Sequence, residues 1–187
     1  MSEPRVSLIL RIDERLDDRN SRDFEKSAKG LESATPWLEL TRMPLLDDVN
    51  PHGPAFEHSN IRFHALPEGP ERDPFLEALK KRNSTKQELS QALSILKKLD
   101  TPTELLLFIG PECPFCPVAV RNAIELSHAS DMVSVIVVDA TRFPSFAESY
   151  NVQSVPLTVI DREEHIVGVV SVKQLSEAIL SKGSEIQ

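Results

Sequence analysis

The fold is decided by the stretch LLLFIGPECPFC at residues 105–116. Its first five residues are all apolar and predict a buried strand. After the second cysteine, apolar residues recur at helical spacing and predict a helix that runs to about Ala129. The only two cysteines of the chain, Cys113 and Cys116, therefore lie at a strand-to-helix turn. A C-x-x-C pair in that position is typical of a dithiol redox site.

The helix start explains the chemistry expected of this pair. Cysteines at positions i and i+3 lie on one helix face, close enough to form a disulfide. Cys113 would face the free N–H groups and the positive dipole end of the helix, which stabilise a thiolate. Lowering the thiol pKa from about 8.5 to about 7 raises the thiolate fraction at pH 7 from roughly 3% to about half. We therefore expect Cys113 to be the nucleophile and Cys116 the resolving thiol. The alternative is a pair of buried small hydrophobes.

Prolines surround the two cysteines and open a later strand. Pro114 is expected at the first helical position, where its missing N–H costs no hydrogen bond, and Pro117 still lies in the first turn. Pro156 precedes the apolar run LTVI at 157–160, and a proline belongs at the start or the edge of a strand. X–Pro bonds are also the only common cis peptides. Val155–Pro156 is thus a candidate cis bond, the alternative being an ordinary turn.

On these motifs, residues 104–180 resemble a thioredoxin-fold domain, with C-x-x-C after the first core strand and Val-Pro before the next. The resemblance implies that the Val155–Pro156 bond is cis and lies against the dithiol. It also implies that the backbone there pairs with the extended chain of a substrate. The substrate-binding residues would then be Pro114, Phe115, Val155 and Pro156.

The second half of the chain contains strands that alternate with helices, followed by a hairpin and a last helix, which is an α/β pattern. The predicted elements are a helix opened by a capping box at residues 84–88 and ended by Asp100-Thr101-Pro102, strands at Glu104–Ile109 and Val133–Val138, a helix at Pro144–Tyr150, strands at Leu157–Asp161 and His165–Val170, and a helix at Val172–Ser181.

The first half repeats this plan in a degenerate form and contains no cysteine. The segment Pro44–Ser59 is rich in Pro, Gly and Asp and is predicted to be mostly loop, although Gly53-Pro54-Ala55-Phe56 stands where the cis-proline strand would begin. The other predicted elements are strands at Val6–Ile12, Trp37–Met43 and Asn60–His64, a helix within Asp13–Gly30, and a helix from Asp73 to about Lys81. We predict two thioredoxin-like folds in tandem, a degenerate unit at 1–82 and a redox-active unit at 83–187.

The doubled layout resembles two groups of tandem thioredoxin-fold proteins. They are the glutaredoxin-like microbial protein disulfide oxidoreductases and the N-terminal domain of the alkyl hydroperoxide reductase flavoprotein subunit. The matching segments are CPFCPVAVR from residue 113, SVP at 154–156 and RFHALPEG at 62–69. A cysteine-free first unit is similar to the flavoprotein's domain, whereas the disulfide oxidoreductases usually carry a dithiol in both units.

This resemblance implies thiol–disulfide oxidoreductase activity. Electrons would come from an NAD(P)H-dependent flavoprotein reductase similar to thioredoxin reductase, and the client would be a peroxiredoxin or another disulfide protein. The alternative function is a non-catalytic thioredoxin-fold binding module with an incidental dithiol. The cysteine-free unit and the segment 44–59 would serve that role.

Composition excludes several other classes of function. The net charge of −8 argues against nucleic-acid binding. No run of about 18 apolar residues predicts a membrane span, and no apolar leader follows the N-terminus, so we expect a cytoplasmic protein. The sequence lacks a dinucleotide fingerprint and a P-loop, so no cofactor of its own is expected.

A metal site is not expected either. His52, His58 and His64 are spaced six residues apart, which matches none of the usual zinc patterns. We interpret them as surface or loop histidines. The C-x-x-C pair alone supplies two ligands, whereas structural zinc needs four.

Thioredoxins carry a buried acid six residues before the first cysteine, and here Leu107 occupies that position. Help with proton transfer is therefore absent or comes from elsewhere in the chain. Glu112 lies beside Cys113 and would raise the pKa of that thiol. Asp139 is interpreted as a polar strand terminus.

Overall fold

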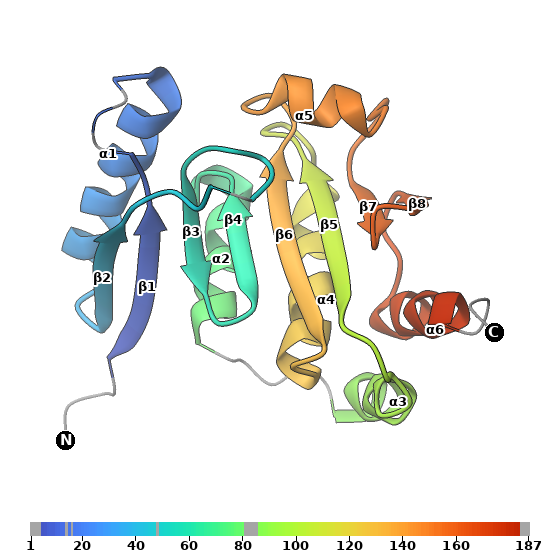
Figure 1. Cartoon of the computed structure of the whole chain (residues 1–187). Helices are drawn as coiled ribbons and strands as arrows, with labels where there is room; N and C mark the ends of the chain where they lie inside the picture. Colours follow the sequence, from blue (N-terminus) through green and yellow to red (C-terminus); the bar gives the residue numbers. More distant parts are fainter. Residues whose placement is uncertain (1–4, 14, 16, 48, 81–85, 184–187) are drawn as a thin grey trace.

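The computed structural model describes residues 5–183 except 14, 16, 48 and 81–85. Among these residues, eight strands form one sheet in the order β2-β1-β3-β4-β6-β5-β7-β8 (Figure 1). The strands are β1 (Val6–Arg11), β2 (Leu38–Met43), β3 (Ala55–His58), β4 (Ile61–His64), β5 (Thr103–Ile109), β6 (Val133–Asp139), β7 (Leu157–Ile160) and β8 (Glu164–Val167). The helices are α1 (Arg19–Ala34), the short 3-10 helix η1 (Gly69–Glu71), α2 (Arg72–Leu79), α3 (Lys86–Leu96), α4 (Cys116–Ala129), α5 (Pro144–Ser149) and α6 (Val172–Gly183).

The sheet consists of two units with the same strand arrangement. In the first unit, residues 5–80, β1 pairs in parallel with β2 and antiparallel with β3. In the second unit, residues 86–183, β5 pairs in parallel with β6 and antiparallel with β7. This confirms the predicted fold class of two thioredoxin-like folds in tandem. The second unit has α5 between β6 and β7, where the first unit has only the loop 44–54.

The two units share the sheet through β4 and β6, which pair in parallel with Ile61 opposite Val135. The side-chain amide of Asn60 strengthens this junction by donating to the backbone carbonyls of Ser127 and Val133. The backbone of the first unit is therefore hydrogen-bonded directly to β6, the outer strand of the second unit.

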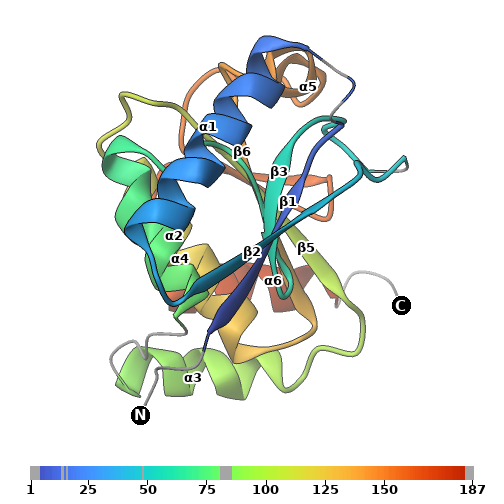
Figure 2. The ribbon, with the colours of Figure 1, turned by 90° about the vertical axis from the view of Figure 1, so that its left-hand side faces the viewer.

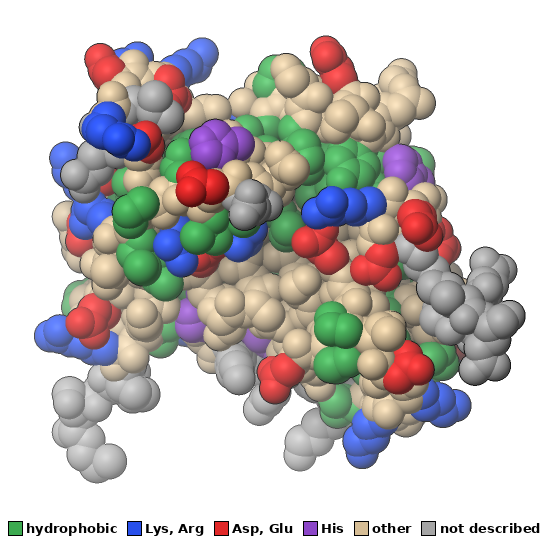
Figure 3. All heavy atoms as spheres, viewed as in Figure 1, with side chains coloured by type: hydrophobic (Ala, Val, Ile, Leu, Met, Phe, Trp, Pro, Cys, Tyr) green, Lys and Arg blue, Asp and Glu red, His purple; other side chains and the backbone are tan. Residues whose placement is uncertain are grey.

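Most helices cover one face of the sheet. Figure 2 shows α1, α2 and α4 on the same side of the strands. The main core lies beneath them, and its aromatic centre is formed by Phe24, Phe56 and Phe75, with ring centroids 5.4 and 5.6 Å apart. A smaller core lies on the other face beneath α5 and includes Phe108, Ile136 and other apolar residues. In Figure 3, which looks onto this second face, hydrophobic side chains gather below α5.

The sequence pattern of each strand follows from how many of its faces are covered. β5 has helices on both sides, so Leu105 to Ile109 are all buried and the strand reads as a continuous apolar run. β2 is an edge strand, and there buried Leu38 is followed by exposed Glu39.

The segment Pro44–Ser59 is mostly loop, as predicted, and its last part forms β3, which begins within the stretch Gly53–Phe56 expected to open a strand. Phe56 is fully buried against the other aromatic rings, and the backbone of β3 pairs with both β1 and β4. Tertiary pairing therefore overrides the Pro and Gly content of the segment. The strand predicted at His165–Val170 ends at Val167, because Gly168 turns the chain with a φ of 87°.

Two predictions fall outside what the structure describes. They are the side chains of the capping box at 84–88 and the boundary between units after residue 82. Within the described ranges, no helix is both long and apolar enough to cross a bilayer.

Candidate active site

The dithiol loop leaves β5 at the edge of the sheet where the parallel strands end. Strands β1, β2, β4, β5 and β6 run in the same direction, so their carboxyl ends meet at this edge (Figure 1, upper edge). Ligand and catalytic sites of open α/β sheets lie at such an edge. Cys113 and Cys116 form a disulfide there, with Cα atoms 5.4 Å apart, so the structure shows the oxidised site.

Helix α4 begins at the second cysteine. The N–H groups of Val118 and Ala119 both donate to the carbonyl of Phe115, which is the N-cap residue. Pro117 lies in the first turn, as predicted. Pro114 was expected at the first helical position, and this is wrong: it lies in the turn before the helix, because the chain becomes helical only after Phe115.

The two cysteines differ in exposure and in surroundings. Cys113 is 9% exposed, whereas Cys116 has no exposed surface. The backbone N–H of Cys116 points at the sulfur of Cys113, at 3.1 Å. An N–H at the start of a helix stabilises negative charge, so a Cys113 thiolate would be stabilised at this position.

The predicted proline loop lies against the dithiol. The Val155–Pro156 peptide bond is cis, as the resemblance implied. The sulfur of Cys113 is 3.7 Å from the carbonyl oxygen of Val155. Gly110 makes room for this approach, because a Cβ there would lie 3.3 Å from the side chain of Val155. The backbone N–H of Gly168 donates to the carbonyl of Pro156 at 2.8 Å and joins the proline loop to the end of β8.

Exposed apolar side chains lie next to these two loops. Phe115, between the cysteines, is 64% exposed, and Val118 in the first turn of α4 is 44% exposed. Val169 follows Gly168 and is 40% exposed. Large apolar side chains that stay exposed in one place mark a contact surface for another molecule. We call Phe115, Val118 and Val169 the apolar rim.

A buried carboxyl of the first unit, Glu71, lies beside α4. Leu107 is fully buried, so β5 offers no proton acceptor at that position. Glu71, the last residue of η1, is 8% exposed, and η1 contacts α4, the helix that begins with Cys116. Among the described residues, neither carboxylate oxygen of Glu71 has a hydrogen-bond partner.

Burial is the main cause that raises the pKa of Glu71 to about 7. The guanidinium of Arg121 in α4 lowers this pKa, and the carboxylate of Asp139 raises it. A pKa near the working pH is the property expected of a group that exchanges protons. No sequence pattern indicated Glu71, because it belongs to the other unit and comes close to α4 only in the folded chain.

Asp139 ends β6 and is itself buried. Its carboxylate accepts hydrogen bonds from the backbone N–H and the hydroxyl of Thr141, at 2.8 and 2.7 Å. It also lies 3.6 Å from Arg142. The predicted polar strand terminus thus fixes the turn that follows β6. Glu112, beside Cys113 in the chain, is exposed.

The three histidines His52, His58 and His64 do not form a cluster. His52 is exposed, but His64 is 1% exposed, so the prediction of a surface or loop residue is wrong for His64. It faces away from the main core, and its Nδ1 lies 3.1 Å from the carbonyl of Pro54 in the loop 44–54. Burial lowers its pKa to about 3. In the described ranges, no three His, Cys, Asp or Glu residues are grouped to hold a metal ion.

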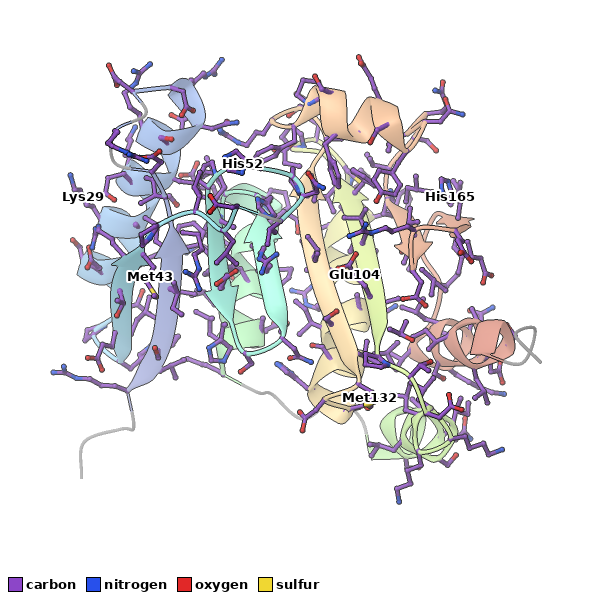
Figure 4. The ribbon with its side chains drawn as sticks, viewed as in Figure 1. Lys29, Met43, His52, Glu104, Met132 and His165 are labelled. Carbon is purple, nitrogen blue, oxygen red and sulfur yellow. A yellow bond between two sulfur atoms is a disulfide. The ribbon has the colours of Figure 1, made fainter. Side chains whose placement is uncertain are left out.

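A cavity of about 740 Å³ lies at the carboxyl ends of β1 and β2, beside the loop 44–54. Met43 and His52, labelled in Figure 4, are among its lining residues. By topology it corresponds to the place of the dithiol in the second unit, but its lining carries acidic and basic groups in place of thiols.

Comparison with known proteins agrees with this geometry. The thioredoxin domain family matches residues 104–180. A thioredoxin from Methanocaldococcus jannaschii is 34% identical over 74 residues, which are 39% of this chain and 87% of that protein. A protein disulfide oxidoreductase from Aeropyrum pernix K1 has the same fold, with a TM-score of 0.79 at 21% identity over 97% of this chain and 87% of that chain. The alkylhydroperoxide reductase protein AhpF from Enterococcus faecalis, as a C503A mutant, gives 0.77 at 20% identity over 94% and 90% of the two chains.

Proposed function

Because this chain belongs to the thioredoxin family and is a thiol–disulfide oxidoreductase, we propose that it is a dithiol electron carrier that reduces protein disulfides. The observation that carries the proposal is the placement of the Cys113–Cys116 disulfide between a helix N-terminus and the cis Val155–Pro156 bond. Cys113 is the partly exposed sulfur and Cys116 the buried one, which supports the roles of nucleophile and resolving thiol.

The first step is attack by the Cys113 thiolate on one sulfur of the client disulfide. A bond forms between Cys113 and that sulfur, the client's own disulfide bond breaks, and the other client sulfur leaves as a thiolate that takes a proton. The carbonyl of Val155, 3.7 Å from the Cys113 sulfur, lies where the backbone of an extended client segment would pair.

The second step releases the client. Cys116 loses its proton, and its thiolate attacks the sulfur of Cys113. The Cys113–Cys116 disulfide forms, and the second client sulfur leaves as a thiolate. Two electrons have then passed from the carrier to the client. Glu71 is the candidate acceptor for the Cys116 proton, because it is buried beside α4 and its pKa is about 7.

The oxidised carrier must then be reduced. We propose that an NAD(P)H-dependent flavoprotein reductase supplies the two electrons and that the client is a peroxiredoxin or another disulfide protein in the cytoplasm. The likeness of the whole chain to the alkylhydroperoxide reductase protein AhpF supports partners of this kind.

The test is the redox potential of the Cys113–Cys116 pair, measured by equilibration in dithiothreitol or glutathione buffers and an alkylation mobility shift. We expect one two-electron transition near −270 mV or below, as for a reductant of the thioredoxin kind. A transition near −120 to −180 mV would make the protein an oxidant or isomerase. If no reversible transition occurs, the binding-module alternative replaces this proposal.

The apolar rim gives a prediction about client recognition. Replacing Phe115 by Ser removes an aromatic side chain that is 64% exposed and touches the client before the sulfurs react. We expect KM for a protein disulfide such as insulin to rise by about fivefold to tenfold, while kcat stays within twofold. The reaction with the small disulfide 5,5′-dithiobis(2-nitrobenzoic acid) should not change.

Exposed Met43, at the far end of the sheet, provides the control as Met43→Ser. An equal loss with both disulfides would mean that Phe115 acts on the thiols and not on the client.

A further inference from the structure

Arg142 joins the cysteine-free unit to the turn beside the dithiol. Its Nη1 lies 3.0 Å from a carboxylate oxygen of Asp23 and 3.2 Å from the side-chain oxygen of Asn20, both on α1. The amide of Asn20 donates in return to the backbone carbonyl of Arg142 at 3.1 Å. On its other side, Nε of Arg142 lies 3.6 Å from Asp139. Helix α1 therefore holds both the side chain and the backbone of this residue.

A second contact from the first unit reaches the next residue. The ring of Phe143 lies edge-on to His64, with centroids 5.4 Å apart. Gly53 in the loop 44–54 lies directly against the same ring, because a Cβ there would be 2.7 Å from Phe143. The segment 139–143 is thus held by three separate parts of the first unit, namely α1, β4 and the loop 44–54.

This segment is bonded in turn to the strand that carries the dithiol. The N–H of Ala140 donates to the carbonyl of Ile109, the last residue of β5, at 3.0 Å. The next residue, Gly110, accepts a hydrogen bond from the N–H of Cys113 at 3.2 Å. Few covalent and hydrogen-bonded links therefore separate Arg142 from the reactive sulfur.

We propose that Arg142 is a positioning residue of the dithiol site, by which α1 of the cysteine-free unit holds the segment 139–143 and balances its charge. Arg142 faces two carboxylates, Asp23 from α1 and Asp139 from β6. Asp139 in turn faces Glu71, whose other charged neighbour is Arg121 from α4. The inference rests on the proposed role of Cys113 as the nucleophile. It gives the unit without cysteines a part in the redox chemistry of the other.

The experiment measures the pH midpoint of Cys113 alkylation in the fully reduced protein, with iodoacetamide in excess. Arg142→Ala removes the cation beside Asp139 and leaves Asp23 with the exposed Arg19, 3.8 Å away, so the thiolate is disfavoured and the midpoint should rise by about 0.5 pH unit. Asp23→Asn removes one of the two carboxylates that face Arg142 and leaves Asp139 as the other, so the positive charge of Arg142 is less balanced and the midpoint should fall. Arg142→Lys keeps the positive charge, so its midpoint should lie between those of the wild type and Arg142→Ala.

Arg22→Ala is the matched control, because Arg22 also pairs with an aspartate near the start of α1, Asp17, but on the exposed surface. Its midpoint should not change. The proposal would be overturned if the midpoints of Arg142→Ala and Asp23→Asn moved in the same direction or did not move. It would also be overturned if the midpoint of Arg22→Ala moved as far as theirs. If Arg142→Ala does not fold, the direction of Asp23→Asn decides alone.

Insulin reduction by the wild-type protein is measured in parallel. Its absence would overturn the proposed function, but the alkylation midpoints would still be readable, because they require no client. The two proposals can therefore fail separately.

Discussion

Replacing Cys113 by Ser is expected to lower the rate of insulin reduction by about 10³-fold or more, because a serine hydroxyl cannot act as the thiolate nucleophile. The partly exposed Cys113 is the sulfur that a client reaches first. The fold should persist, since the site lies on the rim of the core. The measurement is the initial rate of insulin precipitation with dithiothreitol as reductant, with near-ultraviolet circular dichroism to check the fold.

Replacing Cys116 by Ser provides the matched variant. Attack by Cys113 remains possible, but nothing resolves the mixed disulfide, so a covalent complex with the client should accumulate and be visible on a non-reducing gel. Accumulation of the complex in Cys113→Ser and not in Cys116→Ser would reverse the assigned roles.

Replacing Glu71 by Gln is expected to slow disulfide exchange by about tenfold to a hundredfold near pH 7. In the wild type, the rate should rise as Glu71 ionises through a pKa of about 7, and the variant should lack this part of the pH profile. The measurement is the single-turnover rate of client release from pH 5 to pH 9. Glu68→Gln is the control, since Glu68 lies just before η1 but is exposed. An unchanged profile in Glu71→Gln would exclude Glu71 as the proton acceptor.

The Glu71→Gln substitution, which should slow disulfide exchange, should make the folded protein more stable above pH 7 relative to low pH. The pKa of Glu71 is higher in the folded protein, at about 7, than its ordinary value of 4.5, so the folded state binds the proton more tightly. The resulting stability is fully present below pH 4.5 and is lost as the pH rises through 7, by about 3 kcal/mol in all. Glu71→Gln removes this loss. Urea unfolding of the oxidised protein at pH 5 and pH 8 should show a smaller difference for the variant than for the wild type, and an equal difference would contradict the prediction.

Local patterns were enough to predict the centre of the second unit from the sequence. A run of apolar residues fully buried in β5 and a C-x-x-C pair at a helix start are features of neighbouring residues, and so is Val155-Pro156 before β7. The exact start of α4 was not predictable, because the placement of Pro114 depends on how the turn closes on the disulfide.

What the sequence could not show depends on contacts that exist only in the folded chain. The carboxyl of Glu71 comes from η1, which contacts α2 of its own unit and α4 of the other, and burial there raises its pKa. His64 is buried because the loop 44–54 passes over it, although its spacing from the other histidines suggested a surface position. β3 forms because two flanking strands pair with it, in a segment whose composition favours a loop. Each of these positions depends on tertiary contacts that no local pattern contains.

The pairing of β4 with β6 also has a consequence for the synthesis of the protein on the ribosome. Ile61 leaves the ribosome roughly 70 residues before its partner Val135. At a synthesis rate of about 5–20 residues per second, this edge of β4 stays unpaired for roughly 4 to 14 seconds before β6 is synthesised. During that interval its free N–H and carbonyl groups, with the apolar side chains beside them, form an open template for other nascent chains. A holding chaperone would therefore protect this protein from aggregation most while the first unit has been synthesised and β6 has not.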